Sequence, residues 1–344
     1  MDFNFSEEQT MMSAVLREFL DAECTMAQLR KQIAADVARD DDRWAKLAEM
    51  GLFTVLLPED AGGLGLAEQD FVLLAEAAGY ANLPEALIEH AGVAAPLLAA
   101  LSPDHELVAK AAAGEVTLIA GDPATTYLPN IDSADALLLW DGKSVHLVPV
   151  SAVKAVRQES VDPLRRLFKV TWAPSEATRL GGDNAHAWAQ AVNRGTLFSA
   201  AHCIGAAQRC VDMGVDYTKD RNQFGKPIGS YQAVKHLLAR AQVKIEFARP
   251  VVYAAAAYSE PGTFADARIS HAKIAATEAA DAAARAAIQV QGAMGYSWEV
   301  DVHFFLKRVM SLTYAWGGPE FHLERINKRV TELPLGPDQT FGAA

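Results

Sequence analysis

The segment Arg221–His236, with the sequence RNQFGKPIGSYQAVKH, joins two long Ala-rich stretches of the chain. Gly225 and Pro227 predict a turn, because Gly tolerates unusual backbone dihedrals and Pro fixes φ and lacks an N–H. We therefore expect Arg221 to close one helix and Ser230 to cap the next. Working outward from this corner, both flanking stretches are predicted to be helical.

Three side chains of the corner are suited to a dinucleotide. The guanidinium of Arg221 can bind phosphates bidentately, the ring of Phe224 can pack against the ligand, and the amide of Gln232 can bond its polar edges. The same spacing also fits an ordinary helix corner with a surface Arg and a buried Phe. The spacing alone leaves both interpretations open.

Composition limits the classes of protein to which the chain can belong. Its 344 residues are 51% hydrophobic and 22% charged, which is typical of a soluble protein with two or three subdomains. The net charge of −12 argues against nucleic acid or an anionic membrane as the main partner. The N-terminus resembles no secretory signal and no apolar run could span a membrane, so we expect a cytoplasmic protein.

The cysteines and histidines indicate neither disulfides nor metal. The three cysteines, Cys24, Cys203 and Cys210, are an odd and sparse set that suggests a reducing compartment. Cys203 and Cys210 would be separated by about 10 Å on one helix, too far for a disulfide. The nine histidines form no H-E-x-x-H pattern. We expect no metal site.

The N-terminal and middle parts of the chain differ in pattern. Residues 1–104 predict an all-α domain that starts with a Ser6–Gln9 capping box; its later helices are expected at 41–50, 68–79 and 85–101, the last one broken near Pro96. Residues 105–182 predict a reduced β domain, barrel-like or sandwich-like, with five or six short strands. Within it, Asp141-Gly142 predicts a hairpin.

Residues 183–344 are predicted to form a C-terminal helical bundle. Helices are expected at 185–219, 231–258 and 264–290, and a last helix after Pro319. Long helices with short connections are typical of an antiparallel four-helix bundle. We expect a loose tail from Pro334 onward. The fold class is therefore mainly α with a small β domain.

Three segments carry a resemblance to a known family. They are LAEMGLFTVLLPEDAGGLGL at 47–66, GAAQRCVDMGVDYTKDRNQFGKPIGSYQAVKH at 205–236, and IQVQGAMGY at 288–296. Together with the order α block, β domain, helical bundle, they resemble the acyl-CoA dehydrogenase family of flavoproteins over nearly the whole chain. The last segment matches the family's Q-x-x-G-G-x-G-Y, with Ala293 in place of the second glycine.

The resemblance implies FAD as cofactor. In the family the corner reaches across a dimer interface to the adenosine diphosphate half of FAD, which is bound mainly by the neighbouring subunit. The residues implied in cofactor binding are Arg221, Phe224, Gln232, Gln289, Gly292 and Ala293. The resemblance assigns Arg221 to the diphosphate and Phe224 to a position beside it. For Gln289, a buried helix-end amide remains an equal alternative.

The catalytic base of the family is not present at its usual positions. The family reaction removes the α-proton of an acyl-CoA thioester with a carboxylate and transfers the β-hydrogen as hydride to the flavin. The usual Glu precedes the glycine of a Y-E-G-T type segment, where this chain has Trp316. Some members carry the base on the helix leading into the corner, where the matching position is Arg194, followed by Gly195. Neither side chain can accept the proton, so we expect no catalytic residue in this chain.

The signatures that cradle the reactive flavin ring are also missing. The middle domain lacks both the Thr-Glu-Pro…Gly-Ser strand and the later Trp-x-x-Asn/Ser-Gly segment of the family. The chain thus resembles the shortened, base-lacking subunit of α2β2 acyl-CoA dehydrogenases, notably those of bacterial steroid side-chain degradation. That resemblance implies a longer paralogue as partner, which would bind the acyl-CoA, and electron-transfer flavoprotein as acceptor.

Three alternatives remain open from the sequence. The chain could be a self-sufficient homotetrameric dehydrogenase with a relocated base, for which Glu320 and Glu324 lie closest to the motif. Carboxylates in the first turns of a helix are, however, also favoured by the helix dipole. The other two alternatives are a non-enzymatic scaffold and a plain helical bundle without a cofactor.

Overall fold

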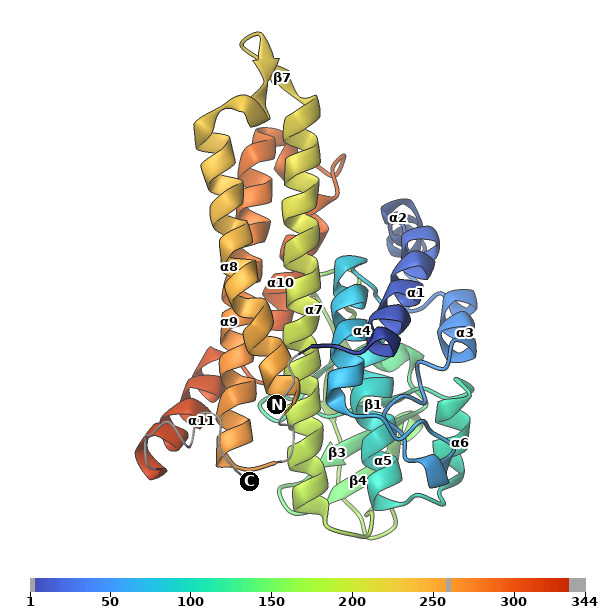
Figure 1. Ribbon diagram of the computed structural model, residues 1–344. Coiled ribbons are helices and arrows are strands. Elements are labelled where there is room, and N and C mark those ends of the chain that lie inside the picture. Colours follow the sequence, from blue (N-terminus) through green and yellow to red (C-terminus); the bar gives the residue numbers. More distant parts are fainter. Residues whose placement is uncertain (1–3, 258–260, 334–344) are drawn as a thin grey trace.

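The computed structural model describes residues 4–257 and 261–333 (Figure 1). The predicted loose tail from Pro334 and the predicted helix end at residue 258 lie outside these ranges. Within them the chain is mainly helical with a small β domain, as the sequence predicted. The boundaries at 104/105 and 182/183 remain a proposal.

The N-terminal part is all α. It consists of α1 (Glu7–Glu23), α2 (Met26–Ala35), α3 (Asp41–Glu49), the 3₁₀ turn η1 (Glu59–Ala61), α4 (Glu68–Tyr80), the π-helix η2 (Ile88–Ala94), α5 (Ala95–Leu101) and α6 (Glu106–Ala112). The capping box of Ser6 and Gln9 is confirmed. The expected break near Pro96 takes the form of the π-helix η2, and Pro96 lies in the first turn of α5, where its missing N–H leaves no bond unmade.

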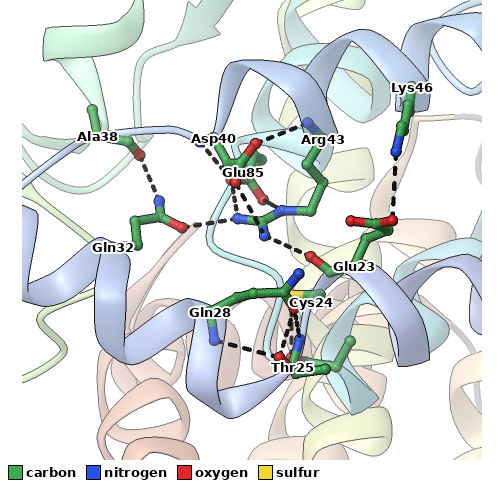
Figure 2. A network of polar contacts seen from close by, with 11 residues as sticks. Glu23, Cys24, Thr25, Gln28, Gln32, Ala38, Asp40, Arg43, Lys46 and Glu85 are labelled. Carbon is green, nitrogen blue, oxygen red and sulfur yellow. Dashed lines mark hydrogen bonds and ion pairs between the residues drawn. The ribbon is translucent and has the colours of Figure 1, made fainter.

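A buried ion pair ties these helices together (Figure 2). The guanidinium of Arg43 on α3 donates to both carboxylate oxygens of Glu85, at 2.6 and 2.8 Å, and both side chains are almost completely buried. It also donates to Gln32 Oε1 on α2 and to the carbonyl of Glu23 on α1. The N–H of Asp40 completes the set by donating to Glu85. This one cation therefore fixes three helices against the segment that leads into η2.

The middle domain has six short strands, which confirms the expected number. They are β1 (Leu118–Ala120), β2 (Tyr127–Pro129), β3 (Ala136–Trp140), β4 (Val145–Pro149), β5 (Lys154–Gln158) and β6 (Leu167–Thr171), in two sheets of order β1-β3-β4 and β2-β6-β5. Only the β1–β3 pair is parallel. The Asp141-Gly142 hairpin between β3 and β4 is confirmed. A small core with side chains from both sheets, including Leu137 and Phe168, gives a sandwich-like arrangement.

The C-terminal helices are α7 (Asn184–Asp220), α8 (Gln232–Ala256), α9 (Thr263–Gln291), α10 (Val302–Tyr314) and α11 (Pro319–Glu332). The four-helix bundle is confirmed, but its fourth member is α10, which the sequence analysis did not anticipate. The helix after Pro319, α11, packs instead on the outside of α9. The sequence analysis assigned no helix between residues 296 and 319, the stretch in which α10 lies.

Two glycines set how closely the N-terminal helices approach the bundle. A Cβ on Gly205 of α7 would lie 1.9 Å from the carbonyl oxygen of Glu76, and one on Gly79 of α4 would lie 2.0 Å from that of His202. Because no side chain intervenes, the backbones of α4 and α7 are in direct contact. The N-terminal domain is thereby held firmly against the helix that carries the corner.

The corner itself is a short hairpin. Arg221 caps α7 as predicted, and β7 (Asn222–Gln223) pairs with β8 (Lys226–Pro227). The prediction that Ser230 caps α8 is wrong. Ser230 lies in the 3₁₀ turn η5 (Ile228–Ser230) and donates its hydroxyl to the carbonyl of Pro227, while Tyr231 occupies the cap position. Because Ser230 belongs to the tight turn after Pro227, it is not available to cap α8.

Candidate functional site

A cavity of about 1070 Å³ lies where the middle domain meets the bundle. Its walls come from the segment between β1 and β2, from β2 itself, from residues 159–161, and from α9, α10 and the start of α11. It is larger than four other cavities in the described part of the chain, whose volumes are about 20, 610, 130 and 660 Å³. Large concave sites of this kind are the usual places for a small-molecule ligand.

Trp316 is fixed in the wall of this cavity. Its side chain is buried, and a Cβ on Gly195 of α7 would lie 2.2 Å from its indole ring. Its backbone N–H donates to Asp122 Oδ2 at 2.6 Å, and its carbonyl accepts from the hydroxyl of Thr196. The indole therefore fills a notch that exists only because residue 195 is a glycine, and it offers no proton acceptor there.

Arg194 points elsewhere. Its guanidinium donates to Glu68 Oε1 on α4 at 2.7 Å, and it does not line the cavity. The residue of α7 that faces Trp316 is its neighbour, Gly195. Arg194, Gly195 and Trp316 include no carboxylate, so neither of the family's two usual base positions supplies a base.

Asp122 is a site residue that the sequence analysis missed. It directly follows β1 and lines the cavity. Its Oδ1 accepts from the N–H of Ala124 at 2.8 Å and its Oδ2 accepts from Trp316. Burial raises the pKa of its carboxyl group. The available signal was its place at the end of a strand, where loop carboxylates often meet a site.

Lys273 is the second missed residue. It lies on α9, is 1% exposed, and donates from Nζ to Ser199 Oγ at 2.6 Å and to the carbonyl of Leu312 at 2.7 Å. Burial lowers the pKa of its ammonium group to about 8. The sequence analysis did not single out this lysine of an Ala-rich helix, since its burial results from the packing of α7 and α10 against α9.

The two carboxylates proposed as relocated bases differ in position. Glu320 lies in the first turn of α11 and lines the cavity, whereas Glu324 is exposed and does not. His322, between them, is buried in the cavity wall, with its Nδ1 3.2 Å from the hydroxyl of Ser270. Of the pair, only Glu320 could act within this cavity.

The corner lies at the far end of the bundle. The side chain of Phe224 is 93% exposed, which excludes a buried Phe within this chain. Phe224 and Gly225 both have positive φ, 53° and 81°, so a bulky aromatic residue is held in the left-handed region at the hairpin tip. Arg221 is exposed, and its guanidinium has no hydrogen-bond acceptor among residues 4–257 and 261–333.

The second group of predicted cofactor residues lies at the same end. Gln289, Gly292 and Ala293 are exposed where α9 ends in the 3₁₀ turn η6 (Gly292–Tyr296), so Gln289 is not a buried amide. Val290 of α9 packs beside Gly214 of α7. Gly214 precedes Arg221 by seven residues, or about 10 Å of helical rise. Both groups thus belong to one end of the bundle, on different helices (Figure 1).

Corner and cavity are far apart within the chain. The cavity residue Trp316 packs on Gly195, and Arg221 lies 26 residues further along the same unbroken helix. At 1.5 Å per residue this is about 39 Å. Figure 1 shows the same separation, with the hairpin at one end of the bundle and β1, β3 and β4 near the other. The corner cannot reach a ligand in its own cavity.

Comparisons with known proteins place this architecture. Residues 6–106 match the acyl-CoA dehydrogenase N-terminal domain and residues 186–331 match the acyl-CoA dehydrogenase C-terminal domain. Acyl-CoA dehydrogenase IpdE2 of Mycobacterium tuberculosis is 32% identical over 330 residues, which cover 95% of this chain and 99% of that protein. The chain belongs to the acyl-CoA dehydrogenase family. The resemblance seen in the sequence is thereby confirmed.

Solved structures of the family share the fold. The ChsE4-ChsE5 complex from Mycobacterium tuberculosis contains a chain with a TM-score of 0.87 and 24% identity, covering 97% of this chain and 100% of that one. A chain in the FAD complex of PigA has a TM-score of 0.84 and 17% identity, covering 96% of this chain and 99% of that one. Acyl-CoA dehydrogenases are flavoprotein oxidoreductases, and FAD is the cofactor of the family.

The exposed corner fits this cofactor chemically. An unpaired guanidinium matches a diphosphate, and an exposed ring beside it can pack on the ligand. Gly292 has φ 60° and nothing within 4 Å of its would-be Cβ, so a ligand can approach the backbone closely.

No metal centre or membrane span accompanies this site. Within the described ranges, no three His, Cys, Asp or Glu side chains are grouped to hold a metal ion, and no helix is long and apolar enough to cross a membrane. The three cysteines are free and buried. Burial raises the pKa of Cys24 to about 12, so its thiol is inert at neutral pH.

Proposed function

We propose that this chain is the non-catalytic subunit of a heteromeric, FAD-dependent acyl-CoA dehydrogenase. A longer paralogue supplies the catalytic base, the flavin-ring site and the acyl-CoA site. This chain completes the adenosine-diphosphate end of that cofactor site with its corner. The complex acts in the cytoplasm and transfers electrons to an electron-transfer flavoprotein.

The observation that carries this proposal is the separation of corner and cavity. Arg221 is about 39 Å of helical rise from Gly195, so its exposed guanidinium serves a neighbouring subunit. The cavity of this chain has Trp316 in its wall where the family usually carries its carboxylate, and Arg194, at the alternative base position, is turned away and paired with Glu68. A base must be able to accept the α-proton, and an indole cannot.

Each corner residue has a role at the partner's FAD. Arg221 binds the diphosphate bidentately, Phe224 packs beside it, and Gln232 bonds a polar edge. Gln289 and the backbone of Gly292 and Ala293 lie further along the same cofactor. When bound, FAD accepts the hydride that leaves the acyl chain. The residues of this chain only hold and orient it.

The relatives support a heteromeric assembly. The ChsE4-ChsE5 complex pairs two differently named subunits, and one of its chains shares the fold of this chain over 97% of its length. IpdE2 matches this chain over 99% of its own length. Relatives that match this chain over almost their whole length therefore include both a protein named acyl-CoA dehydrogenase and a chain of a two-component complex.

The test is co-expression with a longer paralogue encoded nearby. The purified complex should carry flavin and oxidise an acyl-CoA, and the chain alone should do neither. Arg221→Ala should lower the flavin content of the complex by about tenfold or more, since it removes a charge-assisted bidentate contact. Flavin is measured from its absorbance at fixed protein concentration.

Arg179→Ala is the matched control, because Arg179 is an exposed arginine of the middle domain at the opposite end of the molecule. It should leave the flavin content unchanged. Stoichiometric flavin and turnover in the lone chain would refute the subunit assignment. Flavin content unaffected by Arg221→Ala would favour a scaffold role instead.

Glu320 supports one second candidate, a self-sufficient homotetramer with a relocated base. Its carboxylate lines the cavity in which an acyl chain would lie. In that case the lone chain would be active and Glu320→Gln would abolish turnover, while Glu324→Gln would not. The subunit proposal expects no activity for either variant to remove.

A further inference from the structure

The cavity of this chain retains hydrogen-bond donors that nothing in the chain satisfies. An ammonium group has three N–H donors, and Lys273 uses two of them on Ser199 Oγ and on the carbonyl of Leu312. The described residues provide no acceptor for the third. His322 Nε2 is buried and also has no hydrogen-bond partner there. Both residues line the cavity.

These two groups lie together. Ser270, which contacts Nδ1 of His322, precedes Lys273 by one turn on the same face of α9. Lys273 and Arg325 add to burial in lowering the pKa of His322 to about 3, so the imidazole is neutral beside a cation. Buried polar groups are normally satisfied, and a buried cation without a hydrogen-bonded anion is costly. Lys273 and His322 therefore each lack one hydrogen-bond acceptor, and an anionic oxygen of a ligand would suit both.

The remaining walls are suited to an apolar body. Leu128, Pro129 and Leu167 of the middle domain and Ile274 and Ala282 of α9 also line the cavity. Its volume of about 1070 Å³ is at the upper end of what drug-sized ligands require. An elongated hydrocarbon could lie along these walls with its polar end at Lys273.

The exposed lining residues argue against a polyphosphate. They include four carboxylates and two cations: Glu159, Glu278, Asp281, Glu320, Lys244 and Arg285. Of these, Arg285 is already paired with Asp281. These carboxylates would repel a ligand with several phosphates strongly. They would repel a single carboxylate much less, so that it could still reach Lys273.

We propose that this cavity binds a hydrophobic monocarboxylate, a free acid with an extended apolar body, whose carboxylate accepts hydrogen bonds from Lys273 and His322. The ligand is bound and not turned over, because Trp316 occupies the wall where a base would stand. This site is separate from the corner and requires neither FAD nor a partner subunit. Through this site, the occupancy of the subunit would depend on the concentration of the free acid.

The test is a calorimetric titration of the full-length chain at pH 7 with three probes of equal chain length. Dodecanoate should bind with one site per chain and about tenfold or more tighter than 1-dodecanol, which lacks the charge that Lys273 pairs with. Dodecanoyl-CoA should also bind more weakly than dodecanoate, because of its phosphates. Equal affinity for acid and alcohol, or tighter binding of the CoA thioester, would overturn the proposal. So would binding to many sites per chain.

Two variants locate the carboxylate. Lys273→Met keeps the length of the side chain and should reduce the affinity for dodecanoate to that for dodecanol. The matched control, Lys143→Met, changes an exposed lysine of the β3–β4 loop and should have no effect. His322→Leu should weaken dodecanoate binding, and His322→Gln, which retains an N–H donor, should weaken it less. Wild-type affinity in Lys273→Met would exclude the site, and the probe comparison on the wild-type chain stands even if a variant fails to fold.

The pH dependence provides a further readout. Lys273 must be protonated to pair with a carboxylate, and the pKa of its ammonium group is lowered to about 8. The charged or titratable groups that act on it are Cys203 on α7, Arg165 before β6, Asp122 after β1 and His322 on α11. Dodecanoate affinity should therefore fall as the pH rises from 7 to 10, while dodecanol affinity stays constant. A parallel loss for both probes would contradict the assignment to Lys273.

Because this test uses neither flavin nor a partner, its outcome is independent of the proposed subunit function. Either proposal can fail while the other stands.

Discussion

At the scale of single residues, two departures from the family pattern, Gly195 on α7 and Trp316 after α10, pack against each other. Gly195 leaves a notch on α7, and the indole of Trp316 fills it. Asp122 then holds the backbone of Trp316 from the middle domain. Any side chain at position 195 would require the indole to move, so the glycine at 195 and the tryptophan at 316 depend on each other.

Gly195→Ala tests this dependence. The added Cβ would lie 2.2 Å from the indole, and relieving that overlap should lower the free energy of unfolding by about 1–3 kcal/mol. The measurement is urea unfolding of the lone chain. The control is Gly181→Ala, because nothing lies within 4 Å of a Cβ at that exposed position.

The double variant Gly195→Ala/Trp316→Ala separates overlap from other effects. Trp316→Ala alone should cost about 3–5 kcal/mol through the cavity that it leaves. In its presence the alanine at 195 should cost little, so the double variant should lose less than the two single losses combined. Strict additivity would show that the residues do not share the notch.

At the scale of elements, the N-terminal helices depend on one buried cation. The side chains of Arg43 and Glu85 are 2% and 0% exposed, and Glu85→Gln would leave the guanidinium charged without a hydrogen-bonded anion, since the nearest other carboxylate, Asp40, is 3.9 Å away. Breaking a buried pair from one side costs about 3–5 kcal/mol, and we expect that loss in urea unfolding. Glu23→Gln, which affects a half-exposed pair with Lys46, should cost less than about 1 kcal/mol.

The π-helix η2 carries a second element-scale prediction. His90 is fully buried, accepts from the N–H of Leu118 at Nδ1 and lies 3.1 Å from the carbonyl of Ala111 at Nε2. Nε2 must then carry the proton of a neutral ring. Burial lowers the pKa of His90 to about 4, below its usual 6.5.

Because this pKa is depressed on folding, the unfolded chain takes up the proton first. The contribution of His90 to stability is complete above pH 6.5 and is lost as the pH falls to 4, by roughly 3 kcal/mol. The unfolding free energy of the wild type should fall over this range, and that of His90→Gln should fall less steeply. His271→Gln, at an exposed position on α9, should retain the wild-type pH dependence. Equal slopes for all three proteins would contradict the assignment.

At the scale of the whole molecule, the decisive feature is that the corner and the cavity lie at opposite ends of the bundle. α7 runs unbroken from the cavity to the hairpin, so the two cannot share a ligand within one chain. Most of the hairpin is exposed, and Phe224 at its tip combines a positive φ with almost complete exposure, so its ring packs little against the rest of the chain. Such strain is retained where it serves binding.

Phe224→Ala should therefore separate stability from assembly. The unfolding free energy of the lone chain should change by less than about 0.5 kcal/mol, as for other exposed positions. The complex with the longer paralogue should lose flavin on gel filtration more readily than the wild-type complex. Phe247→Ala, which removes another largely exposed ring, this one on α8, should leave flavin retention unchanged.

Local chemistry was sufficient to predict much of this molecule. Helical periodicity, the capping box at Ser6, the Asp141-Gly142 turn and the termination of α7 at Arg221 depend on residues close together in the chain, and all were predicted correctly. Motifs of contiguous residues likewise identified the family and the positions that lack a base. The cofactor roles of the six corner residues stay predictions.

What the sequence could not decide depends on contacts between distant segments. The cap of α8 moved from Ser230 to Tyr231 because the hairpin tightened into a 3₁₀ turn, and α10 displaced α11 from the bundle. Asp122 comes from the middle domain, Lys273 from α9 and His322 from α11. The local sequence around each of them contains no motif that predicts a site. Burial leaves the ammonium group of Lys273 short of one hydrogen-bond acceptor and lowers its pKa. Local sequence therefore determined the elements and the family, and only the tertiary structure placed the buried ammonium group of Lys273 at the wall of a cavity, because burial depends on how distant elements pack.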